Sequence, residues 1–283
     1  MLAALACAAG SGCSGGSMAV GLMEDVMPGA RARLAAEALA ADTPDGRREA
    51  IVTMSQQRWW GLRPAALRAY ALIARTRAEE PTVRCVALRA LGRAGADAMP
   101  HADDILSALG ETDSPHVRWD AAVALDGIQS GGDPSSLARI ISALVTGSGD
   151  APPPENADDL AAAWPDKVIP HLMAHLKWDP KRQAGEPSLD VRRACARALR
   201  NWRRTDVVVV LASAMENDED FAVRKEAHDA LVAVVGRDRG WAESDWEKDM
   251  TMLEPLPSGP RPWWDPLGVF VGSGDAGDDP GDG

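Results

Sequence analysis

Short runs rich in alanine, leucine and valine recur along the middle of the chain, and each begins at or shortly before an arginine. Three residues after that arginine stands a small residue, and seven residues after it a large apolar one, as in "HVRWDAAVAL" (His116–Leu125). Because both offsets lie on one face of an α-helix, each run predicts a helix with a close-packing patch beside a space-filling leucine. The runs cover residues 45–54, 81–91, 114–125, 189–199 and 221–231.

A second set of apolar segments alternates with these runs, and turns rich in proline, glycine and aspartate separate the two sets. A pair of helices of about 35 residues cannot enclose its own apolar face, so successive pairs must stack on one another. We therefore expect an all-α protein, a right-handed α-solenoid of about five to six antiparallel helix pairs. The second helices are predicted at Arg63–Ala74, Ala102–Gly110, Ser135–Val145, Asp166–Leu176 and Asp206–Met215.

The spacing of the arginines predicts one further, diverged repeat. Arg47, Arg84, Arg118, Arg192 and Arg224 are separated by 37, 34, 74 and 32 residues, and 74 is twice 37. This predicts an additional copy between Leu125 and Asp190, with a remnant near Asn156–Trp164, although that remnant lacks the Val-Arg pair and the small positions.

Segments on both sides of the repeats complete the predicted domain, which covers residues 28–253 with recognisable repeats over 43–236. Gly29–Asp42 is predicted to be an amphipathic helix that caps the first pair. Gly240–Leu253 is predicted to cap the last pair, with Trp241 and Trp246 packed against it and the charges facing water.

Residues 254–283 form a tail rich in proline, glycine and aspartate, which predicts a largely disordered, acidic C-terminus. Within it, "RPWWDPLGVF" (Arg261–Phe270) is an apolar island. This island either folds back onto the solenoid or docks on a partner, so Trp263 and Trp264 are candidate binding residues.

Residues 1–17 resemble a bacterial lipoprotein signal, because a short apolar stretch is followed by small residues and by Cys13. The resemblance implies lipidation of Cys13 and a place in the cell envelope. The sequence lacks a lysine or arginine before Arg31, where such signals carry positive charge. The alternative is a flexible tail on a cytoplasmic protein.

Charge and cysteine usage narrow the classes of function. The net charge of −12 and the pI near 4.9 argue against nucleic-acid binding, which depends on clustered lysine and arginine. No apolar run approaches the roughly 20 residues of a membrane span, so membrane contact is expected only through a lipid anchor. Cys85 and Cys195 lie inside the repeats without zinc-site spacing, and we expect neither a metal nor a cofactor.

The frame D-x-x-V-R-x-x-A-x-x-A-L, as in "SLDVRRACARAL" (Ser188–Leu199), resembles the HEAT repeat in its short, phycobilisome-lyase-type form. The resemblance covers roughly Thr43 to Gly236. It implies that the recurrent arginine is structural and pairs with an acid near the turn of its own or an adjacent repeat. The arginines concerned are Arg84, Arg118, Arg192 and Arg224, with Asp113, Asp190 and Asp220 as candidate partners.

Trp119 is the candidate binding residue within the array. It stands one residue after the arginine, where the other copies carry Arg48, Cys85, Arg193 and Lys225, so its position is expected to face water or a neighbouring groove. A tryptophan there is a candidate hot spot for protein binding. The alternative is that it lies flat over a turn and covers Pro115.

Two further clusters are expected to have no catalytic role. His171 and His175 share a helix without the glutamate of a zinc-protease motif, and "ENDED" (Glu216–Asp220) lacks the ligand order of a calcium loop. We expect a solvated or half-buried pair and a solvated turn, respectively.

These observations predict a non-enzymatic scaffold that binds protein at the bacterial cell envelope. The alternative is an enzyme, because HEAT-like folds also occur in bilin lyases and DNA glycosylases. The arginine-rich stretch Val191–Arg204 could supply the basic strip that a glycosylase needs.

Overall fold

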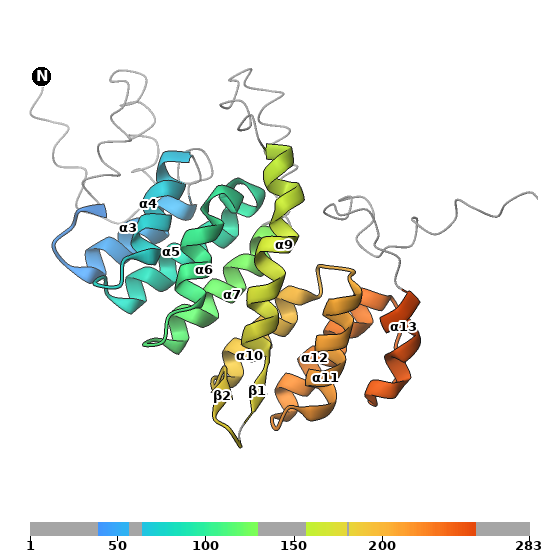
Figure 1. Cartoon of the computed structure of the whole chain (residues 1–283). Helices are drawn as coiled ribbons and strands as arrows, with labels where there is room; N and C mark the ends of the chain where they lie inside the picture. The colour runs from blue at the N-terminus through green and yellow to red at the C-terminus, as the bar shows by residue number, and fades with distance from the viewer. Residues whose placement is uncertain (1–38, 57–63, 130–156, 180, 253–283) are drawn as a thin grey trace, which may run out of the picture.

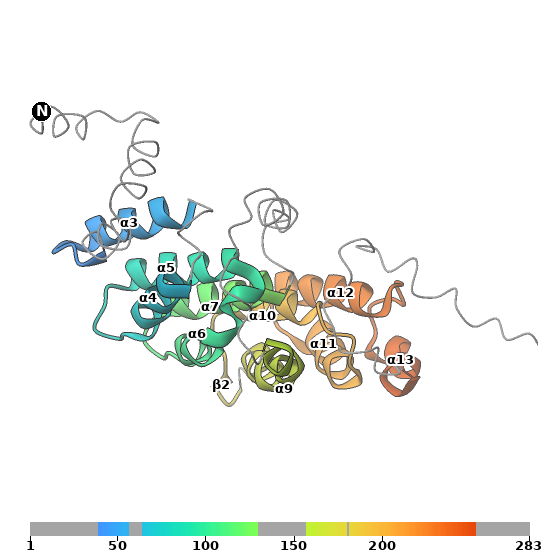
Figure 2. The same cartoon turned by 90° about the horizontal axis from the view of Figure 1, so that it is seen from above.

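The protein is a stack of antiparallel helix pairs arranged in two layers, as a computed structural model of residues 39–56, 64–129, 157–179 and 181–252 shows. In Figure 2 the first helices of the pairs line one side of the molecule and the second helices line the other. The first-helix layer contains α3 (Pro44–Gln56), α5 (Pro81–Ala94), α7 (Pro115–Gln129), α10 (Leu189–Leu199) and α12 (Phe221–Val235).

The second-helix layer faces the viewer in Figure 1. It contains α4 (Pro64–Arg75), the 3₁₀ helix η2 (Gly95–His101) with α6 (Ala102–Leu109), α9 (Ala157–Leu176), α11 (Thr205–Asn217), and η3 (Glu243–Trp246) with α13 (Glu247–Met252). None of the described helices combines the length and apolar character that a membrane span requires. The prediction of an all-α solenoid is confirmed.

Local sequence signals set where the first helices begin and end. Proline stands at the first position of α3, α5 and α7, where its missing N–H costs no hydrogen bond. The Asp220 carboxylate caps α12 by accepting from the N–H groups of Ala222 and Val223 at 2.8 and 3.3 Å. Gly236 ends α12 in the left-handed conformation, with φ of 85°, which glycine adopts without strain.

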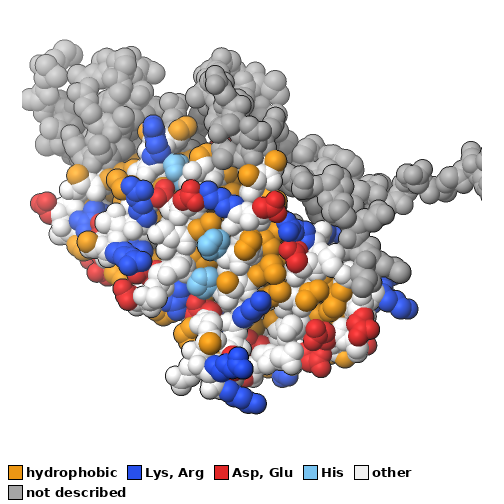
Figure 3. Space-filling model, in the orientation of Figure 1, with side chains coloured by type: hydrophobic (Ala, Val, Ile, Leu, Met, Phe, Trp, Pro, Cys, Tyr) orange, Lys and Arg blue, Asp and Glu red, His pale blue; other side chains and the backbone are white. Residues whose placement is uncertain are grey.

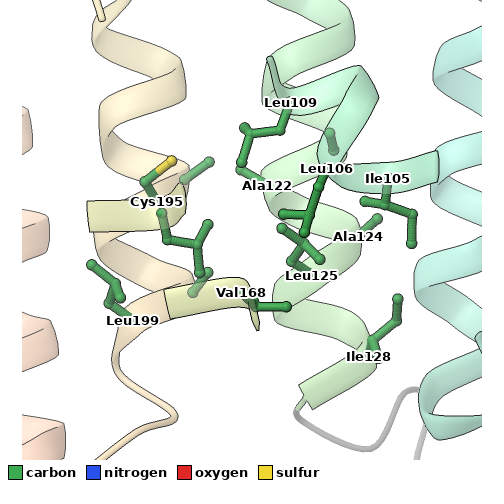
Figure 4. Close-up of a cluster of buried hydrophobic side chains, with 14 of the residues drawn as sticks. Ile105, Leu106, Leu109, Ala122, Ala124, Leu125, Ile128, Val168, Cys195 and Leu199 are labelled. Atoms are coloured by element: carbon green, nitrogen blue, oxygen red, sulfur yellow. The ribbon is translucent and has the colours of Figure 1, made fainter. Parts of the chain in front are cut away.

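The two layers bury one continuous apolar core. The predicted large apolar positions Leu91, Leu125, Leu199 and Leu231 are fully buried, and so are most of the small positions three residues after the arginine. Figure 4 shows residues of α6, α7, α9 and α10 meeting in this core, among them Leu109, Leu125, Val168 and Leu199. The repeat pattern therefore marks the packed faces of the helices.

Glycine lets two first helices approach closely. A Cβ atom added to Gly127 of α7 would lie 2.8 Å from the carbonyl oxygen of Gly92 in α5. That distance is shorter than a carbon can normally approach, so neither helix could keep its place with a larger residue there.

The predicted diverged repeat between Leu125 and Asp190 is wrong. α7 packs directly against α10, and the predicted remnant and the predicted second helix Asp166–Leu176 belong to one helix, α9, which packs against α10. No first helix therefore separates α7 from α10 among the described residues. The long spacing instead contains α9 and a small antiparallel hairpin, β1 (Trp178–Asp179) with β2 (Ala184–Gly185). Equal spacing in sequence is a poor guide here because an insertion can match the length of a repeat.

Several predicted segments lie outside the described residues. These are residues 1–17, the predicted helix Ser135–Val145, the tail 254–283 and most of the predicted capping helix Gly29–Asp42. The other predicted second helices correspond to α4, α6, α11 and the second half of α9.

Candidate functional site

A line of buried ion pairs connects successive helix pairs. Arg118 of α7 donates from Nε and Nη2 to the Glu186 carboxylate at 2.7 and 2.9 Å, and Arg192 of α10 donates in the same way to Asp218 at 2.8 and 3.1 Å. Arg84 of α5 donates from Nη2 to Glu111 at 3.0 Å. All of these side chains are buried. We call this set, Arg84, Glu111, Arg118, Glu186, Arg192 and Asp218, the arginine ladder.

Backbone carbonyls make the ladder continuous. Arg118 Nη1 donates to the carbonyl of Glu111 at 2.8 Å, and Arg192 Nη1 donates to the carbonyl of Glu186 at 3.0 Å. Glu111 and Glu186 thus each bind one arginine with the carboxylate and the next arginine with the carbonyl. Two-point contacts of this kind fix the guanidinium plane, so the ladder sets the register between neighbouring repeats.

The prediction of which acids pair with these arginines was wrong. Asp220 caps α12, Asp190 lies 3.8 Å from Arg193, and the Asp113 carboxylate accepts from the Thr112 hydroxyl. The true partners, Glu111, Glu186 and Asp218, follow the second helix of each pair and meet the arginine across 26 to 68 residues. Proximity in sequence suggested the wrong carboxylates because this contact is made between elements, not within one turn.

Glu186 has the most perturbed carboxylate of the ladder. Burial would raise its pKa, but hydrogen bonds from His175, Arg118 and the Ser188 N–H outweigh burial and lower the pKa to about 2. Glu186 therefore stays ionised over the whole physiological range, and it has the character of a structural anion.

The two histidines of α9 do not form a joint site. His175 Nδ1 lies 3.2 Å from Glu186, whereas His171 is exposed. Within the part of the chain that the structure describes, no group of three or more His, Cys, Asp or Glu side chains could hold a metal ion. Figure 3 looks onto this layer and shows histidines and apolar patches among scattered charges over α9 and α11.

The two described cysteines are packing residues. Cys85 and Cys195 are buried thiols, and burial, with a smaller effect of Asp120, raises the pKa of Cys85 to about 12. Burial also raises the pKa of Cys195. Thiols held in this neutral form are poor nucleophiles and poor metal ligands.

Trp119 lies on the outer surface of the first-helix layer, where the sequence predicted it. Its side chain is 36 % exposed, and the Arg89 guanidinium of α5 lies 5.8 Å from the ring centroid. Arg89 donates to both oxygens of Asp120 at 2.6 and 3.0 Å, and Asp120 is buried. We call Arg89, Trp119 and Asp120 the outer cluster. Pro115 is exposed, so Trp119 does not bury it.

Only one residue of the outer cluster, Trp119, was predicted from the sequence. Trp119 stood out because its column is otherwise polar or small, whereas nothing marked Arg89 or Asp120. Asp120 is the one aspartate in its column, where Arg47, Arg84, Arg192 and Arg224 are followed by Glu49, Val86, Ala194 and Glu226. Other copies have alanine or valine at this position, which cannot form an ion pair. A carboxylate at this position is therefore the sequence feature that could have identified Asp120.

The arginine-rich stretch Val191–Arg204 is neutralised by carboxylates. Arg197 lies 3.4 Å from Glu226, Arg200 lies 3.6 Å from Asp126, and Arg204 contacts Asp166 and Asp206 at 2.6 and 3.0 Å. A phosphate backbone would have to compete with these internal partners. The geometry therefore gives no support to the basic groove that the DNA-glycosylase alternative requires.

The acidic run Glu216–Asp220 is a structural junction and not merely a solvated turn. Asp218 is the ladder partner of Arg192, and Asp220 caps α12. Glu216 accepts from the Glu243 N–H at 2.7 Å, and Glu219 accepts from the Trp178 indole at 2.9 Å. These carboxylates are occupied by the protein itself and are not arranged as cation ligands.

The C-terminal end of the stack carries a group of aromatic side chains. Trp246 is fully buried, as predicted, but Trp241 is 50 % exposed and does not pack down completely. Its ring stacks on His228 at 4.3 Å and lies 6.2 Å from the ring of Phe221, which is itself 61 % exposed. We call Phe221, Trp241 and His228 the end cluster.

The remaining predicted site residues, Cys13, Trp263 and Trp264, lie outside the described residues. Arg224 of α12 occupies the ladder position of its repeat, with its guanidinium 5.6 Å from the Phe221 ring. Trp119 and the end cluster lie on different repeats, so the structure does not combine them into one site.

Comparison with known proteins supports the repeat assignment. The chain matches no curated protein. Residues 69–151 match the family model described as HEAT repeats, so the region that contains α5, α6 and α7 is similar to HEAT repeats, as the resemblance implied.

Proposed function

We propose that this protein is a non-enzymatic scaffold that binds another protein through the outer surface around Trp119. HEAT repeats generally mediate interactions between proteins, which supports the class of function. The observation that carries the choice of surface is the geometry of the outer cluster: an exposed indole held beside an arginine that is itself fixed by a buried carboxylate.

The outer cluster is suited to binding because it is already ordered. The Arg89 side chain is held at two of its three donor nitrogens, Nε and Nη2, so little of its conformational freedom remains to be lost when a partner covers it. Tryptophan and arginine are the residue types that most often dominate interface energies. An apolar side chain of the partner would gain contact with the free part of the Trp119 ring.

The neighbouring surface extends this contact. His116 and Val123 lie three residues before and four residues after Trp119 on the same face of α7, and both are at least partly exposed. Leu189, at the start of the adjacent α10, is 41 % exposed. The surface is therefore apolar at its centre and polar at its rim, the arrangement typical of protein interfaces.

The proposed location is the bacterial cell envelope, with Cys13 lipidated and the solenoid held close to the membrane. This part of the proposal rests on the N-terminal sequence alone. It predicts that Cys13→Ser abolishes labelling by a lipid precursor and releases the protein from the membrane fraction.

The function is tested by affinity capture from an envelope extract of the source organism, with residues 17–283 as bait. Trp119→Ala should lose the captured partner, with binding weakened by at least about 30-fold if Trp119 is a hot spot. Val209→Ala is the matched control, because Val209 of α11 is 41 % exposed on the opposite layer. Equal capture by both variants would show that the partner, if any, binds elsewhere.

A further inference from the structure

The arginine at the ladder position of the last first helix, Arg224 of α12, contacts no carboxylate among the described residues, whereas its counterpart in the first pair, Arg47 of α3, binds Glu79 at 2.7 Å. In α7 and α10 the arginine Nε donates to a carboxylate, and in α5 it donates to the carbonyl of Ala74 at 2.9 Å. Nε of Arg224 in α12 is buried and has no hydrogen-bond partner among the described residues. The same holds for Nε of Arg47 in α3, but that arginine binds the Glu79 carboxylate through Nη2. A buried donor without an acceptor costs free energy, and at Arg224 no bound carboxylate offsets this cost, so an acid beside Arg224 would stabilise this end of the stack.

The register of the ladder indicates where the missing acid stands in the chain. Each earlier acid follows the second helix of its pair: Glu79 and Glu111 come four and two residues after α4 and α6, and Asp218 comes directly after α11. Glu186 follows α9 after the intervening hairpin. The second helix of the last pair, α13, ends at Met252, and the next acid in the chain is Glu254, two residues later.

The surface beside Arg224 is apolar and uncovered. Phe221 and Trp241 are the two most exposed aromatic side chains in the described part of the chain, at 61 % and 50 %. Their ring centroids are 6.2 Å apart, so they form one patch with the Arg224 guanidinium at its edge. In the earlier repeats the next first helix covers the corresponding side of the stack, and α12 has no such neighbour among the described helices. Exposed aromatic pairs of this kind mark a docking site.

The chain after Glu254 has the composition and length to cover this patch. It carries Trp263 and Trp264 inside the apolar segment Arg261–Phe270. Trp263 is the ninth residue after Glu254, an extended reach of about 30 Å, whereas α12 with 15 residues is about 22 Å long. From a position beside Arg224, the segment can therefore reach any point along α12.

We propose that the segment Glu254–Phe270 closes the C-terminal end of the solenoid in place of a further helix pair. Glu254 accepts from Arg224 as the last acid of the ladder, and Trp263 and Trp264 lie on Phe221 and Trp241. This inference does not depend on the scaffold function, and it assigns Trp263 and Trp264 to the protein's own surface and not to a partner.

Hydrogen–deuterium exchange of the full chain tests the aromatic contact. Trp263→Ala/Trp264→Ala should speed amide exchange about tenfold in peptides that cover residues 221–246, because the cover over that end is lost. Peptides from α5 should not change. Unchanged exchange over 221–246 would overturn the proposal. So would a dimer by light scattering that becomes monomeric in the variant, because a second copy would then supply the cover.

A double-mutant cycle tests the ion pair separately. Arg224→Gln and Glu254→Gln should each lower the melting temperature by a few degrees, and the double variant should be no less stable than the weaker single variant. Asp265→Asn is the matched control, since Asp265 is a second acid of the same segment, and it should leave the melting temperature unchanged. Additive effects of the two substitutions, or an effect of Asp265→Asn equal to that of Glu254→Gln, would contradict the assignment of Glu254.

Discussion

The arginine ladder and the outer cluster use the same chemical contact in two different settings. In each, an arginine donates to both oxygens of a carboxylate on another element: Arg118 to Glu186 inside the stack, and Arg89 to Asp120 on its outer surface. Both partners of the inner pair are buried, with 8 % and 2 % of the side chains exposed. In the outer pair, the Arg89 side chain is 48 % exposed while Asp120 is buried.

The two arginines also differ in how often they recur among the repeats, and this separates contacts that stabilise the fold from contacts that are particular to one repeat. The ladder arginine recurs in every recognised repeat, whereas Arg89 has the counterparts Val123, Arg197 and Asp229 in the later copies. A contact that recurs along the stack stabilises it. The pairing of Arg89 with Asp120 has a counterpart only in the longer Arg197–Glu226 contact at 3.4 Å, and only Arg89 lies beside an exposed tryptophan, so this pair can serve recognition. Variation between repeats, more than the repeat itself, is therefore where function is to be sought.

The largest effect is expected from breaking the inner pair. Arg118→Leu leaves the buried Glu186 carboxylate without its main partner, and it should lower the free energy of unfolding by about 3–5 kcal/mol. Urea unfolding followed by circular dichroism measures this. A loss below about 1 kcal/mol would mean that the ladder does not hold the repeats in register.

The pH dependence of stability is the next largest effect. The pKa of Glu186 is lowered from 4.5 to about 2 in the folded protein, so its stabilising contribution is complete above the unfolded pKa and is lost as the pH falls toward 2. The contribution is on the order of 3 kcal/mol.

Unfolding measured between pH 7 and pH 2 should show this loss in the wild-type chain. Glu186→Gln should be less stable at pH 7 and should depend less on pH below pH 5, because glutamine does not titrate. Parallel pH profiles for the two proteins would show that other carboxylates cause the acid sensitivity.

The smallest effect is expected in the outer cluster. Arg89→Ala removes the partner of the buried Asp120 carboxylate. Because water can reach this site, the free energy of unfolding should fall by only about 1–2 kcal/mol. Arg197→Ala is the matched control: Arg197 occupies the same repeat column, and its contact to Glu226 is a single one at 3.4 Å with both side chains partly exposed. In that variant the free energy of unfolding should fall by no more than about 0.5 kcal/mol. If Arg89→Ala lowered the free energy of unfolding as much as Arg118→Leu does, the outer cluster would serve to stabilise the fold and not to bind a partner.

Much of the fold could be predicted because it depends on periodicity along the chain. The alternation of two apolar helices, the small and large columns around Arg84 and Arg192, and the turns between helices are local features that one sequence displays. The number of repeats was harder to predict from the sequence, because the chain between α7 and α10 contains an insertion about as long as a repeat.

The partners of the charged residues could not be predicted in the same way. Glu186 and Arg118 are 68 residues apart, whereas Asp113 lies five residues before Arg118, has the same charge as Glu186 and also stands beside a turn. Sequence reasoning favours the near acid, whereas the folded chain places the carboxylate of a distant loop against the guanidinium.

By itself, the sequence determined that this chain forms stacked helix pairs, where most of those helices lie and that Trp119 stands at an outward-facing position. The tertiary structure alone decided which acid completes each arginine, which cations of α10 are neutralised, and that Arg89 and Asp120 hold Trp119 in place. The physical reason is that helix formation and amphipathic burial follow from neighbours within a few residues. Ion pairs and exposed aromatic surfaces instead depend on which elements the stack brings together.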